Sequence, residues 1–224
     1  VFELSCGLPF LAFAPMCERE IDAVHAETGA GTSYRLTRCV TLGPGESESC
    51  CFYWGLGYEE VAAATSAKEM LRQGWNHELK TTLDYLRSRS WHTDAAHLRA
   101  LYNPNLFFCI FYSPGRTIDT EELVMVTSRS SRYYVSAAYW DRDSLFWSFP
   151  TVLDADPSLA RDMLLCAFGR QARNTGIHSR FIDGTVLEPG FELDELMAPI
   201  LALERYVSAT GDGSVLNLPC ITEG

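Results

Sequence analysis

Residues 138–147 read Ala-Tyr-Trp-Asp-Arg-Asp-Ser-Leu-Phe-Trp, a stretch that sets two carboxylates and an arginine among aromatic side chains. The stretch predicts the start of a helix. Asp143 or Ser144 can act as its N-cap, and apolar residues recur from Leu145 to Leu153. Acids at the start of a helix lie where loops and binding functions concentrate. This helix start is therefore the first candidate for a functional site.

The same residue types suit a sugar, since the C–H face of a sugar ring stacks on an aromatic ring. Its hydroxyls can hydrogen-bond to carboxylates. In this interpretation Trp140 forms the aromatic wall, with Asp141, Arg142 and Asp143 beside it. The alternative interpretation is a capping acid with a surface salt bridge, which stabilises a protein only slightly.

Composition excludes several kinds of partner. The chain has 224 residues and a formal net charge of -11, which argues against nucleic acid and anionic membranes because both attract clustered Lys and Arg. No apolar run approaches the roughly 18 to 20 residues of a membrane span. We therefore expect a neutral polar partner such as an oligosaccharide.

Cysteine and histidine spacing predicts neither a metal site nor a cofactor. The eight cysteines are scattered without a Cys-x-x-Cys pair, which favours free thiols in a reducing compartment and a cytoplasmic protein. The five histidines show neither His-x-x-x-His nor His-Glu-x-x-His spacing, so zinc is not expected.

The chain changes character along its length, which predicts three parts. Residues 1–64 read as strands around a turn at Gly43–Ser47, and we expect part of an antiparallel β-sandwich. Residues 65–91 have the apolar spacing of an amphipathic linker helix. Residues 92–224 read as helices separated by long loops. We expect a piece of a longer protein, because the chain begins within an apparent strand and ends without a closing element.

The helical part contains a second acid-rich helix start. Helices are expected over 95–112, with an interruption near Pro104, and over 144–153, 159–172 and 193–209. Asp156 caps the third of these, with Pro157 in its first turn. Long loops over 116–138 and 178–189 precede the second and fourth. If the helices alternate up and down, both loops lie on one face, and the acids of both helix starts line one pocket.

Two motifs resemble a known family. Tyr139–Ser144 resembles the Trp-x-Arg-Asp-Ser/Thr signature that opens an inner helix in glucoamylases and in the C-terminal domain of glycogen debranching enzymes. Gly190–Glu195, followed by Pro199–Leu203, is similar to a stretch of related (α/α)6-toroid glycosidases, including metal-independent α-mannosidases. The resemblance implies a mostly α protein in which residues 92–224 form the first helical hairpins of an incomplete (α/α)6 toroid.

The resemblance also implies roles for the first motif. Asp143 would bind sugar hydroxyls in the innermost subsite, Arg142 would orient that carboxylate, and Trp140 would form the wall. Asp141 stands at a variable position of the signature and is a further candidate for sugar binding.

The second motif supplies Phe191, Asp194 and Glu195 as substrate-binding candidates, and Asp194 is also the catalytic candidate within this chain. Arg180 and Asp183, in the preceding loop, either bind substrate or form an ion pair that fixes the loop.

Glycoside hydrolysis needs two carboxyl groups, an acid and either a base or a nucleophile. The resemblance places the main acid and base after both motifs. We therefore expect a glycosidase of α-glucan-like or α-mannoside oligosaccharides, in which this segment supplies the substrate-binding subsite and is inactive alone. The alternative is a non-catalytic carbohydrate-binding or scaffold module.

Overall fold

A computed structural model describes residues 12–219 except 20, 29–31, 118–120 and 128–137. The chain divides into two compact units, Val1–Asp84 and Tyr85–Gly224. The division falls within helix α2 (Trp75–Arg89).

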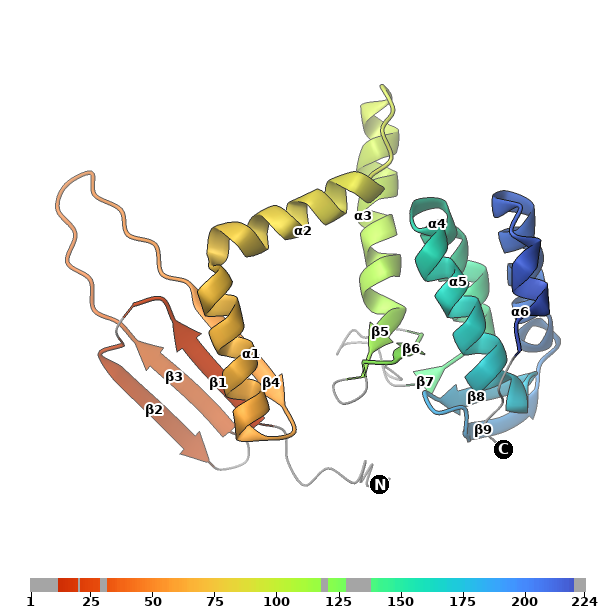
Figure 1. The fold of residues 1–224 in the computed structure, drawn as a ribbon, viewed down its shortest axis with the longest axis horizontal. Coiled ribbons are helices and arrows are strands. Elements are labelled where there is room, and N and C mark those ends of the chain that lie inside the picture. Colours follow the sequence, from red (N-terminus) through yellow and green to blue (C-terminus); the bar gives the residue numbers. More distant parts are fainter. Residues whose placement is uncertain (1–11, 20, 29–31, 118–120, 128–137, 220–224) are drawn as a thin grey trace. The chain divides into compact units, whose positions relative to one another are not determined.

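The N-terminal unit contains two antiparallel strand pairs and a helix (Figure 1). Strands β1 and β4 pair, with Ala14 opposite Gly55, and β2 and β3 form a second pair. The strands are β1 (Ala12–Cys17), β2 (Ala23–Thr28), β3 (Thr32–Thr37) and β4 (Phe52–Gly57).

Helix α1 (Glu60–Gln73) packs on β4 at unusually short range. A Cβ atom at Gly55 would lie 1.9 Å from the carbonyl oxygen of Ala63, and one at Gly57 would also meet the helix. Ala63 and Ala67 are buried in this contact. Because β4 presents glycines and α1 presents alanines, the backbones of strand and helix approach closely.

The expected β-sandwich is wrong. In the described part of residues 12–84 the strands form two-stranded sheets, and the layer that covers one face of β4 is helix α1, not a second sheet. The expected single helix over 65–91 is two helices, α1 and α2, which meet at Gly74. The φ of +80° at this residue favours glycine and breaks the helical path.

The C-terminal unit is built mainly from helices, with α4 packed on α3 and α5, and α5 on α6 (Figure 1). The α-helices are α3 (Ala96–Tyr112), α4 (Phe149–Ala155), α5 (Pro157–Cys166) and α6 (Leu193–Thr210). The other helices are the π-helices η1 (Arg142–Ser148) and η2 (Ala167–Gln171) and the 3₁₀ helices η3 (Ala172–Asn174) and η4 (Gly213–Asn217). The expected start of α5 is confirmed, because Asp156 accepts a hydrogen bond from the Leu159 N–H at 3.1 Å.

Short strands occupy segments that the sequence predicted to be loops. Strands β5 and β6 pair with each other, and β7, β8 and β9 form a three-stranded antiparallel sheet in that order. Their bounds are β5 (Pro114–Arg116), β6 (Leu123–Met125), β7 (Ala138–Tyr139), β8 (Ile177–Phe181) and β9 (Val186–Phe191).

The expected (α/α)6 toroid is also wrong, although helices do predominate. The segments between the helices pair with one another as strands at one end of α3–α6, where hairpins of a helical ring would have simple loops (Figure 1). The core lies between these helices and includes Leu106, Phe149, Met163 and Ala202. Among the described residues, no helix combines the length and apolar character needed to cross a bilayer.

Candidate functional site

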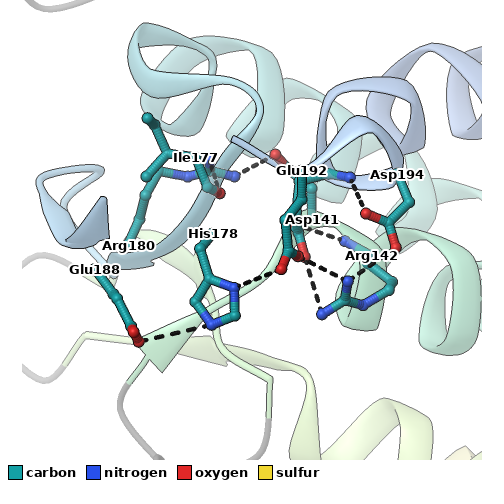
Figure 2. Close-up of polar contacts among 9 residues, drawn as sticks. Asp141, Arg142, Ile177, His178, Arg180, Glu188, Glu192 and Asp194 are labelled. Atoms are coloured by element: carbon teal, nitrogen blue, oxygen red, sulfur yellow. Dashed lines mark hydrogen bonds and ion pairs between the residues drawn. The ribbon is translucent and has the colours of Figure 1, made fainter. Parts of the chain in front are cut away.

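The two acid-rich helix starts meet in the C-terminal unit. Arg142, the first residue of η1, extends its guanidinium toward the start of α6 (Figure 2). Its Nη1 donates to Glu192 Oε2 at 2.9 Å and to Asp194 Oδ2 at 2.8 Å. We call Arg142, Asp143, Glu192 and Asp194 the acidic mouth. The structure thus brings together residues of both sequence motifs, 50 residues apart.

The ion pairs of the acidic mouth stabilise the charged forms of its side chains. The hydrogen bond to Asp194 raises the pKa of Arg142, and the same bond lowers the pKa of Asp194. Asp194, with a side chain 47% exposed, therefore stays ionised. A general acid has to hold a proton, so this geometry disfavours Asp194 as the general acid, and its bond to Arg142 suits a binding role.

Asp143 is the least satisfied carboxylate of the acidic mouth. It is half-buried, and burial raises its pKa, while neighbouring Arg142 opposes that shift. No hydrogen bond or ion pair joins it to another described residue. The sequence predicted Asp143 or Ser144 as the N-cap, but the residue at the N-cap is Asp141, whose side chain makes no capping bond. Asp143 therefore lies inside the first turn of η1.

Glu195 lies beneath the acidic mouth, with its side chain fully buried. Its Oε2 accepts the backbone N–H of Arg142 at 3.1 Å, and its Oε1 lies 3.5 Å from Arg142 Nη2 without a hydrogen bond from any described residue. Burial raises the pKa of Glu195 to about 7. The sequence predicted a sugar contact here, but the buried side chain instead positions Arg142.

Asp141 and Arg180 form a second buried arrangement. Arg180 is fully buried and pairs with Asp141, which also accepts a hydrogen bond from the Tyr139 hydroxyl at 2.6 Å. Arg180 also donates to the Asn174 carbonyl oxygen at 2.7 Å. The sequence predicted that Asp141 binds substrate and that Arg180 either binds substrate or forms an ion pair that fixes its loop, but neither side chain reaches the surface. Their ion pair instead ties β8 to the start of η1.

Asp183 lies apart from the acidic mouth, in the turn between β8 and β9. Its carboxylate accepts hydrogen bonds from the backbone and hydroxyl of Thr185, at 2.9 and 2.7 Å. Burial raises the pKa of Asp183, but the bonds from Thr185 outweigh it and the net shift is downward. Asp183 also lines a separate cavity of about 390 Å³, together with Arg116 and Arg170. It therefore fixes a turn and does not join the other candidates.

The aromatic candidates differ in exposure. Trp140 is buried, and the edge of its ring system meets His178, with ring centroids 5.9 Å apart. Phe191, next to Glu192, and Trp147, four residues after Asp143, are each 69% exposed. The accessible aromatic surface is therefore supplied by Phe191 and Trp147, whereas Trp140 supports the site from within.

His178 and Glu192 also belong to the site, although the sequence did not predict either of them. His178 Nδ1 lies 2.8 Å from Glu192 Oε1, and its Nε2 lies 3.6 Å from Glu188 Oε2 (Figure 2). The bond to His178, supplemented by the bond to Arg142, lowers the pKa of Glu192. The signal available in the sequence was Glu192 itself, which stands inside the second motif beside the chosen Phe191 and Asp194.

Metal binding has little support in the described part of the chain, where no cluster of three or more His, Cys, Asp or Glu side chains has suitable geometry. Carboxylates are instead satisfied by Arg142, Arg180 and His178. The arrangement can therefore offer hydrogen-bond acceptors and one guanidinium to a polar ligand. No model of a known protein family matches this chain, and a search of curated proteins finds no match either.

Proposed function

We propose that the acidic mouth binds carbohydrate, as the substrate-binding subsite of a glycosidase that hydrolyses O-glycosidic bonds in α-glucan-like or α-mannoside oligosaccharides. The observation that carries the proposal is Asp143, a half-buried carboxylate with no hydrogen bond or ion pair to another described residue. A buried polar group that lacks a partner in the free protein is costly, and a ligand hydroxyl can supply that partner.

The surroundings of Asp143 support a neutral polyol as the ligand. The acidic mouth has three carboxylates and one guanidinium, so a phosphate or another anion would meet net repulsion. Arg142 already donates to Glu192 and Asp194 and is fixed from below by Glu195. Sugar hydroxyls both donate and accept, which suits a site made mainly of acceptors. The exposed rings of Phe191 and Trp147 add apolar surface for the face of a sugar ring.

Hydrolysis itself is assigned by the resemblance and not by this geometry. Asp194 is ionised and paired with Arg142, and Glu195 is buried, so neither is placed as a proton donor to a bound glycoside. The acid and base of the reaction are therefore proposed to lie outside these motifs. The second candidate function is a non-catalytic carbohydrate-binding or scaffold module. It is favoured by the ion pair of Asp194 and by the burial of Glu195.

The test compares oligosaccharide binding by the wild-type chain with binding by Asp143→Asn. Calorimetric titration with α-linked gluco- and manno-oligosaccharides should show at least about a tenfold loss in the variant, since one charged hydrogen bond contributes about 1.5 kcal/mol or more. Asp94→Asn, at an exposed aspartate of the same unit, is the matched control. Equal affinity of the wild type and Asp143→Asn for every sugar that binds would refute the assignment, as would no binding at all.

Assays of sugar release separate the two candidate functions. Release of reducing sugar by the longest natural form of the chain, with a lower kcat/KM in Asp143→Asn, would support the glycosidase. Binding without release would support the module. We also propose a cytoplasmic location, which is supported by the free thiols of all six described cysteines.

A further inference from the structure

Two thiols of the N-terminal unit lie next to each other, far along the chain from the acidic mouth. Cys17 is the last residue of β1, and Cys50 stands two residues before β4. Their Sγ atoms are 3.4 Å apart. A disulfide bond is about 2 Å long, so the sulfurs need to approach by little more than about 1 Å.

The segments that carry the two thiols are held together on both sides of the pair. Glu48 accepts hydrogen bonds from Arg19 at 2.8 Å and from Arg38 at 2.6 Å. The Glu18 N–H donates to the Cys51 carbonyl oxygen at 3.5 Å. The ladder continues from there, with Cys17 opposite Phe52. The proximity of the thiols is therefore fixed by neighbouring contacts and not by the thiols alone.

We propose that Cys17 and Cys50 form a reversible disulfide, and that the N-terminal unit thereby responds to the thiol–disulfide balance of its surroundings. The oxidant is a small disulfide such as oxidised glutathione. The thiolate of one cysteine attacks a sulfur of this disulfide and expels one glutathione thiolate. The second cysteine then loses its proton and attacks the mixed disulfide, which expels the second glutathione. Each cycle oxidises two protein thiols and reduces one glutathione disulfide to two thiols.

Cys50 is the entry point for the oxidant because it is exposed, whereas Cys17 is half-buried. The hydrogen bond with the Cys17 thiol raises the pKa of Cys50, so little thiolate is present near neutral pH and exchange is faster at alkaline pH. The disulfide would close a loop that contains the whole β2–β3 pair. The disulfide would thus link the last residue of β1 covalently to the segment just before β4.

The test uses the whole chain with oxidised glutathione at pH 8.5. We expect the wild type to lose two free thiols without forming dimers, and to yield a peptide pair that joins Cys17 to Cys50 in non-reducing mass spectrometry. Dithiothreitol should restore both thiols. Cys50→Ser and Cys17→Ser should each abolish the joined peptides. Cys51→Ser is the matched control, because it removes the adjacent thiol, and it should behave as the wild type.

Three results would overturn the proposal. One is an unchanged yield of the internal link in Cys50→Ser, which would assign the link to Cys51. Another is stable addition of glutathione to Cys50 with no internal link. The third is oxidation only to disulfide-linked dimers. If circular dichroism shows that a serine variant is misfolded, the exposed Cys50 can instead be alkylated in the folded wild type. Alkylated Cys50 should then give no joined peptides.

Discussion

Glu195 should make the stability of the C-terminal unit depend on pH. Its pKa rises from the usual 4.5 to about 7 in the folded protein, since its side chain is buried beneath Arg142. The unfolded chain therefore releases this proton at a lower pH than the folded chain. The contribution of Glu195 to the free energy of unfolding is therefore fully present below about pH 4.5 and is lost as the pH rises to about 7. A shift of this size corresponds to about 3 kcal/mol.

The perturbation is Glu195→Gln, which keeps the shape of the side chain and an oxygen that can accept the Arg142 N–H. Glutamine does not titrate, so the variant should not lose this free energy as the pH rises. We expect its stability relative to the wild type to increase by about 3 kcal/mol between pH 4.5 and pH 7.5. The assay is hydrogen exchange of the buried α6 amides, which reports on this unit.

Glu204→Gln serves as the control, because Glu204 is an exposed glutamate on the same helix. It should follow the wild type at every pH. A difference between Glu195→Gln and the wild type that stays constant from pH 4.5 to pH 7.5 would refute the reasoning. Such a result would mean that Glu195 ionises in the folded protein as it does in the unfolded chain, and that burial is offset by Arg142.

Three further substitutions test the packing. Arg180→Met should cost about 3–5 kcal/mol in urea unfolding, because it leaves the Asp141 carboxylate buried without its cation; a loss below about 1 kcal/mol would contradict a buried pair. Gly55→Ala should cost about 3 kcal/mol or more and lower the thermal midpoint of the N-terminal unit, because its Cβ would overlap the Ala63 carbonyl oxygen; an unchanged midpoint would contradict this contact. Asp156→Ala should cost about 2 kcal/mol in the same unfolding assay, because it removes both the cap of α5 and the ion pair with Arg89; Asp156→Asn keeps a capping oxygen but loses the ion pair, so it should recover only the capping part of that loss.

Local signals were sufficient for several elements. The pair Asp156–Pro157 predicted the start of α5, since a cap and a first-turn proline act within a few residues. The apolar spacing after Leu193 predicted α6, which ends one residue beyond the expected boundary. The predicted interruption near Pro104 is absent, because α3 continues through this proline as one helix. Packing of the helix in the core overrides the local cost of a proline.

Long-range partners explain most of what the sequence did not predict. Nothing near Asp141 indicates that its partner is Arg180, 39 residues later, so both residues were predicted as candidates for substrate binding. At Gly55 the close neighbour is Ala63 of α1, so a helix packs on β4 where a second sheet was expected. A glycine in a strand indicates that another element approaches closely, but it does not identify that element. By contrast, the two acid-rich motifs could be found as candidates because each combines charge and aromatic residues at a helix start.

The π-helical form of η1 has a consequence for insertions and deletions. The Phe149 N–H donates to the Ser144 carbonyl oxygen, five residues earlier, where an α-helix would use the fourth. A deletion of one residue between these two positions would let the segment adopt α-helical bonding and leave the register of α4 unchanged. Because a π-helical turn holds one residue more than an α-helical turn, Arg142 and Asp143 would keep nearly the same direction relative to α4. Homologues of one residue less between Ser144 and Phe149 should therefore keep both the core and the acidic mouth.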